Sequence, residues 1–184
     1  MIFIETERLI LRQWQQNDYA EFAKLTASVE VMKYFPSTLT TEQSDEGIER
    51  SKSSIKDKGF GFWAAELKQT NEFIGFIGIN DPGDGYPFSP SIEIGWRLAQ
   101  RFWGKGYASE GAKASLEFAF KKLGLNEIIS MTPVLNSNSM KVMQRIGMQD
   151  TKQNFIHPKL IKPHELAEHV LYKTTLEQWR AMQS

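Results

Sequence analysis

Hydrophobic residues recur along this chain in short runs whose spacing alternates between that of strands and that of helices. Residues 8–14 are apolar and tend to β structure, and an amphipathic run follows at 19–26. Asn17 and Asp18 precede that run and are the expected N-cap, because their side chains can accept hydrogen bonds from the first turn. The pattern therefore opens with a strand and a helix.

Helical patterns continue in the next stretch. A short helix is expected over residues 28–34, stopped by Pro36, because a residue before proline avoids the helical region. A polar helix follows, which begins at Thr40 or Thr41 and ends near Lys56. We therefore expect the first third of the chain to form helices that pack over a sheet.

The middle of the chain changes to a β pattern. The runs at 60–68 and 72–80 are rich in β-branched and aromatic residues and are joined by a short polar turn, which predicts a hairpin. Residues 82–90 include three prolines and two glycines and are expected to form a loop. With the run at 91–98, this stretch predicts a three-stranded antiparallel meander.

A glycine-bearing turn at residues 101–108 separates this meander from a helical stripe at 109–123, and a strand pattern returns at 126–133. The order strand, turn, helix, strand predicts a βαβ unit with a right-handed crossover and parallel outer strands. The sheet is therefore expected to be mixed, which places the fold in the α/β (α+β) class.

The last third is expected to hold one more helix and two strands. Polar residues at 136–139 would cap a helix that ends near Arg145, and Gly147 follows it. The runs at 148–156 and 167–174 are strand-like.

Bulk composition narrows the possible partners. A chain of 184 residues suits one domain spanning 1–184, and its 22 Lys+Arg and 22 Asp+Glu cancel, which argues against binding to nucleic acid or an anionic membrane. There is no cysteine, so a thiolate nucleophile and a thiolate metal site are excluded. The start of the chain lacks the pattern of a signal peptide, and no run approaches the roughly 20 apolar residues that span a bilayer. A cytoplasmic protein is expected.

The turn at 101–108 has the features of an anion site. Gly104 and Gly106 let a ligand approach the backbone, and the first N–H groups of the following helix point outward with the positive end of its dipole. We expect it to hold the pyrophosphate of a nucleotide-bearing cofactor. A P-loop would need Ser or Thr after Lys105, where Gly106 stands, and a dinucleotide fingerprint would need an acidic residue about 20 positions on, which is missing.

Two motifs together identify a family. The turn itself has the sequence Arg101-x-x-Gly104-x-Gly106 and follows a strand that contains Glu93. A second motif lies downstream: Asn136-x-x-Ser139-x-x-Val142-x-x-Arg145-x-Gly147-Met148. In this order and spacing they resemble the GNAT superfamily of acetyl-CoA-dependent N-acetyltransferases. The Trp-Gly-Lys-Gly-Tyr-Ala spelling of the turn resembles its RimJ/RimL-type branch.

The resemblance implies a strongly bent, mixed, mostly antiparallel sheet with helices on both faces. Two central strands, at residues 92–98 and 128–133, would splay apart and admit the pantetheine arm of acetyl-CoA, the expected co-substrate. The turn would hold the pyrophosphate, the strand before it would pair with the arm, and Asn136 would meet the arm from the other side. The expected cofactor-binding residues are Trp96, Leu98, Arg101, Phe102, Trp103, Gly104, Lys105, Gly106, Tyr107, Ala108, Ser109, Asn136 and Ser139.

Acetyl transfer to an amine needs a base, because an amine with a pKa near 10.4 is protonated at neutral pH. Glu93 is the candidate, since strand alternation turns it away from the side of Ile92 and Ile94, towards an open cleft. The alternative is a solvated carboxylate or an ion pair with Arg97 or Arg12.

The departing thiolate needs a proton donor. Many GNAT enzymes use a tyrosine, but Met143 stands at the matching position, whereas Ser139 matches the serine that serves in RimL-type enzymes. The alternative for Ser139 and Asn136 is helix capping alone.

Acceptor contacts are expected from Tyr34 and Phe35 in the helical cover and from His157 in the C-terminal segment, although core aromatics and structural histidines are the alternatives. The three histidines lack the spacing of a zinc helix, so no metal is expected.

The sequence thus predicts an acetyl-CoA-dependent N-acetyltransferase that acts on a primary amine, either a protein N-terminus or a small molecule. Direct attack in a ternary complex is expected, because no cysteine can carry the acetyl group. A non-catalytic acyl-CoA-binding domain is the main alternative. The sequence of the turn gives little support to a third class, a phosphate-binding NTPase. Because dimers are common among similar enzymes, a homodimer is an open alternative to a monomer.

Overall fold

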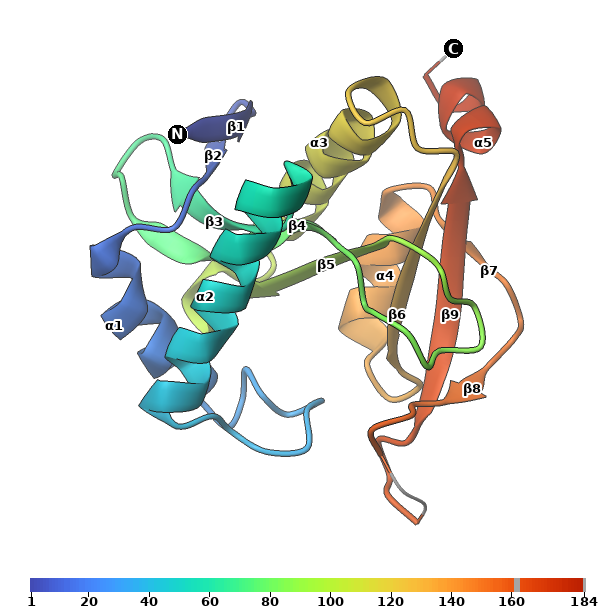
Figure 1. Cartoon of the computed structure of the whole chain (residues 1–184), viewed down its shortest axis with the longest axis horizontal. Helices are drawn as coiled ribbons and strands as arrows, with labels where there is room; N and C mark the ends of the chain where they lie inside the picture. Colours follow the sequence, from blue (N-terminus) through green and yellow to red (C-terminus); the bar gives the residue numbers. More distant parts are fainter. Residues whose placement is uncertain (161–162, 184) are drawn as a thin grey trace.

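A single mixed sheet organises the molecule (Figure 1). In the computed structural model, which describes residues 1–160 and 163–183, the strand order is β1-β2-β3-β4-β5-β6-β9-β7, and β8 pairs with β9. The strands are β1 (Ile2–Glu5), β2 (Leu9–Arg12), β3 (Phe62–Leu67), β4 (Phe73–Asn80), β5 (Glu93–Leu98), β6 (Glu127–Pro133), β7 (Gln149–Asp150), β8 (Phe155–Ile156) and β9 (Glu168–Thr175). The helices are α1 (Gln16–Thr26), α2 (Thr41–Lys58), α3 (Tyr107–Lys121), α4 (Ser137–Arg145) and α5 (Leu176–Ala181), with a short 3-10 turn η1 at Gln100–Phe102.

The sheet is antiparallel from β1 to β5, parallel between β5 and β6, and antiparallel again beyond β6. The predicted meander and the predicted βαβ unit, with α3 as its crossover, are therefore confirmed. So is a mixed, mostly antiparallel α+β sheet.

Helices cover both faces, as expected. Trp63 and Ala64 are neighbours on β3, so their side chains point to opposite faces. The Trp63 ring contacts Phe118 of α3, with 5.2 Å between centroids. On the other face Phe76, the register partner of Ala64, contacts Phe22 of α1. The α1 and α2 pair thus lies on one face of the sheet and α3 on the other (Figure 1).

The central strands β5 and β6 meet only at one end. Their register pair is Glu93 with Ile129, and the Ile129 N–H donates to the Ile92 carbonyl at 3.0 Å. The Ser130 hydroxyl donates to the Ile94 carbonyl at 2.9 Å, and the two strands then diverge (Figure 1). The expected splay of two central strands is therefore present.

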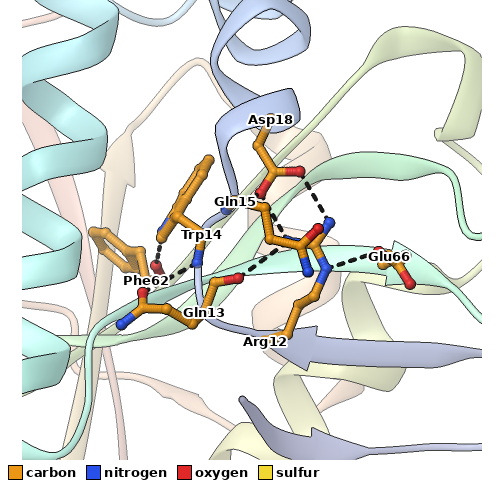
Figure 2. Close-up of polar contacts among 7 residues, drawn as sticks. All are labelled: Arg12, Gln13, Trp14, Gln15, Asp18, Phe62 and Glu66. Carbon is orange, nitrogen blue, oxygen red and sulfur yellow. Dashed lines mark hydrogen bonds and ion pairs between the residues drawn. The ribbon is translucent and has the colours of Figure 1, made fainter.

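A buried ionic cluster fixes the entry of α1 onto the sheet (Figure 2). The Arg12 guanidinium, at the end of β2, donates to both carboxylate oxygens of Asp18 at 2.7 and 2.9 Å and to Glu66 of β3 at 2.7 Å. The same Asp18 carboxylate accepts the Gln15 N–H at 2.7 Å. Because Arg12 and Asp18 are only 6% and 2% exposed, each charge depends on its partner.

That cluster corrects the expected helix start. The N-cap of α1 is Gln15 rather than Asn17 or Asp18, and Asp18 is the third helical residue, which closes a capping box. By contrast, the expected Thr40 and Asn136 caps begin α2 and α4.

Two other element predictions are wrong. Residues 28–34 form turns rather than a helix, in which a single bond from the Met32 N–H to the Ser28 carbonyl, at 3.0 Å, is not continued. The strand expected over 148–156 is split into β7 and β8, because Lys152 takes a positive φ of 61° and donates its N–H to the Asp150 side chain. The short elements β1 and α5 are not among the predicted ones.

Candidate active site

A cavity of about 810 Å³ opens where β5 and β6 part. Its walls come from β5 and β6, the turn before α3, the start of α4, the connection between α1 and α2, and the segment after β8. It therefore adjoins both the predicted cofactor turn and the face of the sheet covered by α1 and α2.

The turn before α3 has the geometry of an anion site. Gly104 and Gly106 have φ of 72° and 85°. Gly106 is the N-cap residue of α3 and has no side chain that could bind the first N–H groups of the helix. The buried Ser109 hydroxyl, in the first turn of the helix, lines the cavity and has no hydrogen-bond partner within residues 1–160 and 163–183. Helix N–H groups, the helix dipole and an unpartnered hydroxyl together fit a pyrophosphate.

Contacts from outside the cavity hold this turn in place. The Arg8 guanidinium donates to the Lys105 carbonyl at 3.0 Å and pairs with Glu110 of α3 at 2.6 Å. Arg101 is exposed and pairs with Glu72 at 2.9 Å. The Arg101 side chain and the Lys105 carbonyl are therefore bound outside the cavity, and neither residue is among those that line it.

The other predicted cofactor residues are brought together in the wall of the cavity. They are Trp96, Leu98, Phe102, Trp103, Gly104, Gly106, Tyr107, Ala108, Ser109, Asn136 and Ser139.

Backbone groups of β5 face the gap between the strands. The carbonyls of Ile92 and Ile94 accept hydrogen bonds from β6. Because backbone groups alternate between the two sides of a strand, those of Trp96 face the same way, beyond the last contact with β6. The Leu98 carbonyl accepts the Trp103 indole N–H at 2.7 Å. An extended pantetheine arm could pair with β5 at Trp96, where β5 no longer pairs with β6.

Glu93 lies at the closed end of the gap. Its carboxylate lines the cavity and accepts a hydrogen bond from the Asn80 side chain at 3.3 Å. Desolvation raises the pKa of Glu93 to about 7, although the Asn80 hydrogen bond and the charge of Lys159 oppose the shift. A carboxylate with this pKa can accept a proton at neutral pH. The alternative ion pair with Arg12 is wrong, because Arg12 is bound to Asp18 and Glu66.

Asn136 and Ser139 form a tight local cap at the start of α4. The Asn136 amide accepts the Ser139 N–H at 3.2 Å and donates to the Ser139 hydroxyl oxygen at 3.1 Å and to Thr132 at 2.9 Å. Ser139 lines the cavity, and its hydroxyl proton remains free to donate because the oxygen acts as acceptor in that contact. Met143 is buried in the core and carries no hydroxyl.

A tyrosine that the sequence did not identify also lines the cavity. The His157 Nδ1 accepts the Lys159 N–H at 3.2 Å, so neutral His157 carries its proton on Nε2 and donates it to the Tyr86 oxygen at 3.1 Å. The Tyr86 hydroxyl proton can therefore point at a ligand. Burial, together with the charge of Glu93, raises the pKa of Tyr86, and burial lowers the pKa of His157.

The predicted acceptor residues reach the cavity from different segments of the chain. Tyr34 and Phe35 come from the connection between α1 and α2, whereas His157 follows β8. Burial, followed by the charge of His157, lowers the pKa of the neighbouring His169 to about 4, so its ring is neutral at pH 7.

Arg97 is a second cavity residue that the sequence did not assign to the site. Its position four residues after Glu93 could have placed it on the same face of β5, because side chains alternate along a strand. For Tyr86 the sequence holds no such signal, since it lies in the Pro- and Gly-rich loop before β5.

Within residues 1–160 and 163–183, no group of three or more His, Asp or Glu side chains is arranged to hold a metal ion. In the same residues, no helix has both the length and the apolar character needed to cross a bilayer.

Comparison with known proteins agrees with this geometry. The acetyltransferase (GNAT) domain family matches residues 8–149. An uncharacterised N-acetyltransferase, YnaD of Bacillus subtilis, is 30% identical over 177 residues, which is 96% of this chain and 98% of the relative. A crystal structure of a GNAT-family acetyltransferase from Bacillus anthracis superposes with a TM-score of 0.79 at 28% identity and covers 96% of this chain and 99% of that one. The FsC-acetyl coenzyme A-N(2)-transacetylase of Aspergillus fumigatus is 34% identical over 129 residues, which is 68% of this chain and 54% of that protein.

Proposed function

Since the chain belongs to the GNAT family of acetyl-CoA-dependent N-acetyltransferases, we propose that it acetylates a primary amine by direct attack in a ternary complex, with Glu93 as the base. The observation that carries this proposal is the position of Glu93, at the closed end of the gap between β5 and β6 and in the wall of the shared cavity. The acceptor is a protein N-terminus or a small-molecule amine.

The two substrates would approach from different sides. The N-terminus of α3 would hold the pyrophosphate of acetyl-CoA, and the backbone of Trp96 would guide the pantetheine arm along β5. Tyr34, Phe35, Tyr86 and His157 would receive the acceptor on the other side. This arrangement favours simultaneous binding, because neither ligand has to leave before the other enters.

Glu93 would take a proton from the acceptor ammonium, directly or through one water, so that the neutral nitrogen attacks the thioester carbon. The C–S bond breaks as the C–N bond forms, and the CoA sulfur leaves as a thiolate. Ser139 would donate its hydroxyl proton to that sulfur and regain a proton from the attacking nitrogen, which loses its second proton as the amide forms. The proton on Glu93 passes to solvent, which restores the base.

The acceptor nitrogen is supported by one relative. The Aspergillus fumigatus protein is named for acetyl transfer to the N(2) position of FsC. That name concerns a nitrogen acceptor and is compatible with a small molecule as substrate of this chain.

The proposal is tested by two-substrate kinetics with acetyl-CoA and a panel of peptides and small amines, with free CoA as the measured product. A ternary complex gives intersecting double-reciprocal plots. Parallel plots would indicate an acetylated enzyme and contradict direct attack. CoA binding without turnover of any amine would contradict the proposed transfer.

A further inference from the structure

The Arg97 guanidinium is a cation in the cavity without a counter-ion. Arg97 lines the cavity from β5, and its buried Nε has no hydrogen-bond partner in the part of the chain that the structure describes. Within residues 1–160 and 163–183, no carboxylate forms an ion pair with it. Aromatic rings occupy its surroundings instead: the guanidinium carbon lies 4.0 Å from the centroid of Phe35 and 5.5 Å from that of Phe76.

Burial of this unpaired guanidinium costs folding free energy when no ligand is bound. Burial lowers the pKa of Arg97 to about 10, so the side chain still carries its charge at pH 7. Contacts with the two rings offset part of the desolvation, but they leave the N–H donors unpaired. The two acids in the cavity wall, Glu30 and Glu93, do not supply the missing charge, because neither forms an ion pair with Arg97. An anion that enters the cavity would complete the site.

The cofactor phosphates are expected elsewhere. Arg97 and Phe76 are register partners, and both side chains lie on the face covered by α1. Trp96 and Leu98 alternate to the other face, where the N-terminus of α3 provides the phosphate site. Arg97 therefore belongs to the acceptor side of the cavity.

We propose that Arg97 binds a carboxylate of the acceptor, so that the substrate is an amine that also carries a carboxylate. This inference rests on the proposed function, since it names the class of the acceptor in the same site. A guanidinium that lies against aromatic rings presents its edge, and the planar fork of N–H donors on that edge matches a carboxylate.

The distance along β5 limits the length of that acceptor. Glu93 and Arg97 lie on the same face and four residues apart, which in an extended strand is roughly 13 Å between Cα atoms. The Glu93 carboxylate and the Arg97 guanidinium form no ion pair, and this spacing favours an amine and a carboxylate on different carbons. The acceptor is therefore expected to separate the two groups by several bonds, as in a free basic amino acid acetylated on its side chain.

The test compares two amines that differ in the carboxylate alone: 6-aminohexanoate and hexylamine. Binding of each to the CoA-loaded protein is measured by titration calorimetry, and acetylation of each is followed by CoA release. Arg97→Gln removes the charge, and Arg97→Lys keeps the charge but not the fork. Lys33→Gln is the matched control, because it removes a positive charge from an exposed residue of the same cavity.

Wild type is expected to bind 6-aminohexanoate about tenfold or more tightly than hexylamine, as a charge-assisted hydrogen bond would give. The preference should be lost in Arg97→Gln, reduced in Arg97→Lys and kept in Lys33→Gln. CoA affinity should be the same in all four proteins, which also reports that each is folded.

Equal or absent binding of the two amines, or a preference that survives in Arg97→Gln, would overturn the assignment. Tighter binding of 5-aminopentyl phosphate than of 6-aminohexanoate would overturn the choice of a carboxylate. An Arg97-dependent binding preference without any acetylation would support the anion site and refute the proposed transfer, so the two failures are distinguishable.

Discussion

Glu93 of β5 lies opposite Ile129 of β6, in the register pair where the two strands meet before they diverge. The carboxylate is therefore at the closed end of the gap, and the glycine turn before α3 is at the open end of β5. A linear ligand that is held at the turn and lies along β5 would bring its far end towards Glu93. This relationship connects the proposed phosphate site to the proposed base.

The raised pKa of Glu93 predicts a pH-dependent cost to folding. The folded state binds a proton more tightly than the unfolded chain, whose Glu93 titrates near its ordinary value of 4.5, so ionisation at higher pH destabilises the fold. The cost is absent below about pH 4.5 and complete above about pH 7. Glu93→Gln should therefore stabilise the protein by up to about 3 kcal/mol at pH 8 and by little at pH 4.5. Urea unfolding at the two pH values measures this, and an equal effect at both would contradict it.

Ser139→Ala should lower kcat with little change in acetyl-CoA affinity, because the hydroxyl is proposed to protonate the leaving sulfur. The expected loss is about 10²- to 10³-fold for the removal of one hydrogen-bond donor. Ser137→Ala, at the exposed first residue of α4, is the matched control and should leave kcat unchanged. Steady-state kinetics and CoA binding separate the two effects. Unchanged turnover in Ser139→Ala would remove that residue from the acid role.

A side chain at Gly104 should weaken acetyl-CoA binding. Among the described residues, an added Cβ would meet no atom within 4 Å other than those of its chain neighbours, but the residue has a φ of 72° and lines the cavity. Gly104→Val would therefore strain the turn and intrude on the ligand. Gly59→Val provides the control, since Gly59 has a φ of 78° and equal space at the end of α2. Both variants should lose similar stability in thermal unfolding. A similar dissociation constant for CoA in both would contradict the assignment of the turn.

Loss of the buried arginine at the end of β2 should destabilise the fold strongly. Arg12→Ala leaves the carboxylates of Asp18 and Glu66 without their partner, and breaking such a buried pair costs about 3–5 kcal/mol. Arg50→Ala removes an exposed partner of Glu46 and should cost less than about 0.5 kcal/mol. Chemical denaturation compares the two. Equal losses would mean that the cluster in Figure 2 contributes little.

Local chemistry explains which parts of the fold could be predicted from the sequence. Thr40 and Asn136 cap α2 and α4 through their own side chains, so both helix starts are visible in a few residues. Gln15 begins α1 through a capping box with Asp18, whose carboxylate Arg12 also binds, whereas side-chain capping preference alone favours Asn17 or Asp18 as the N-cap.

Backbone geometry and long-range packing explain most of the remaining errors. The break between β7 and β8 depends on a positive φ at Lys152, which a lysine rarely adopts. The cavity residues Tyr86 and His157 are 71 positions apart and meet only after the sheet has formed. The residues of the two family motifs lie mainly in the wall of the cavity, whereas Tyr34, Tyr86 and His157 reach it from connections between helices and strands.

The pH dependence of kcat/KM tests the central claim most directly, because it reports the protonation state of the proposed base. With pKa about 7 for Glu93, kcat/KM for wild type should rise with pH through 7 and level off above it. Glu93→Gln should lose this limb and about 10²- to 10⁴-fold in activity. Glu30→Gln, in an exposed acid of the same cavity, should keep the limb. A limb near pH 7 that persists in Glu93→Gln would contradict the account.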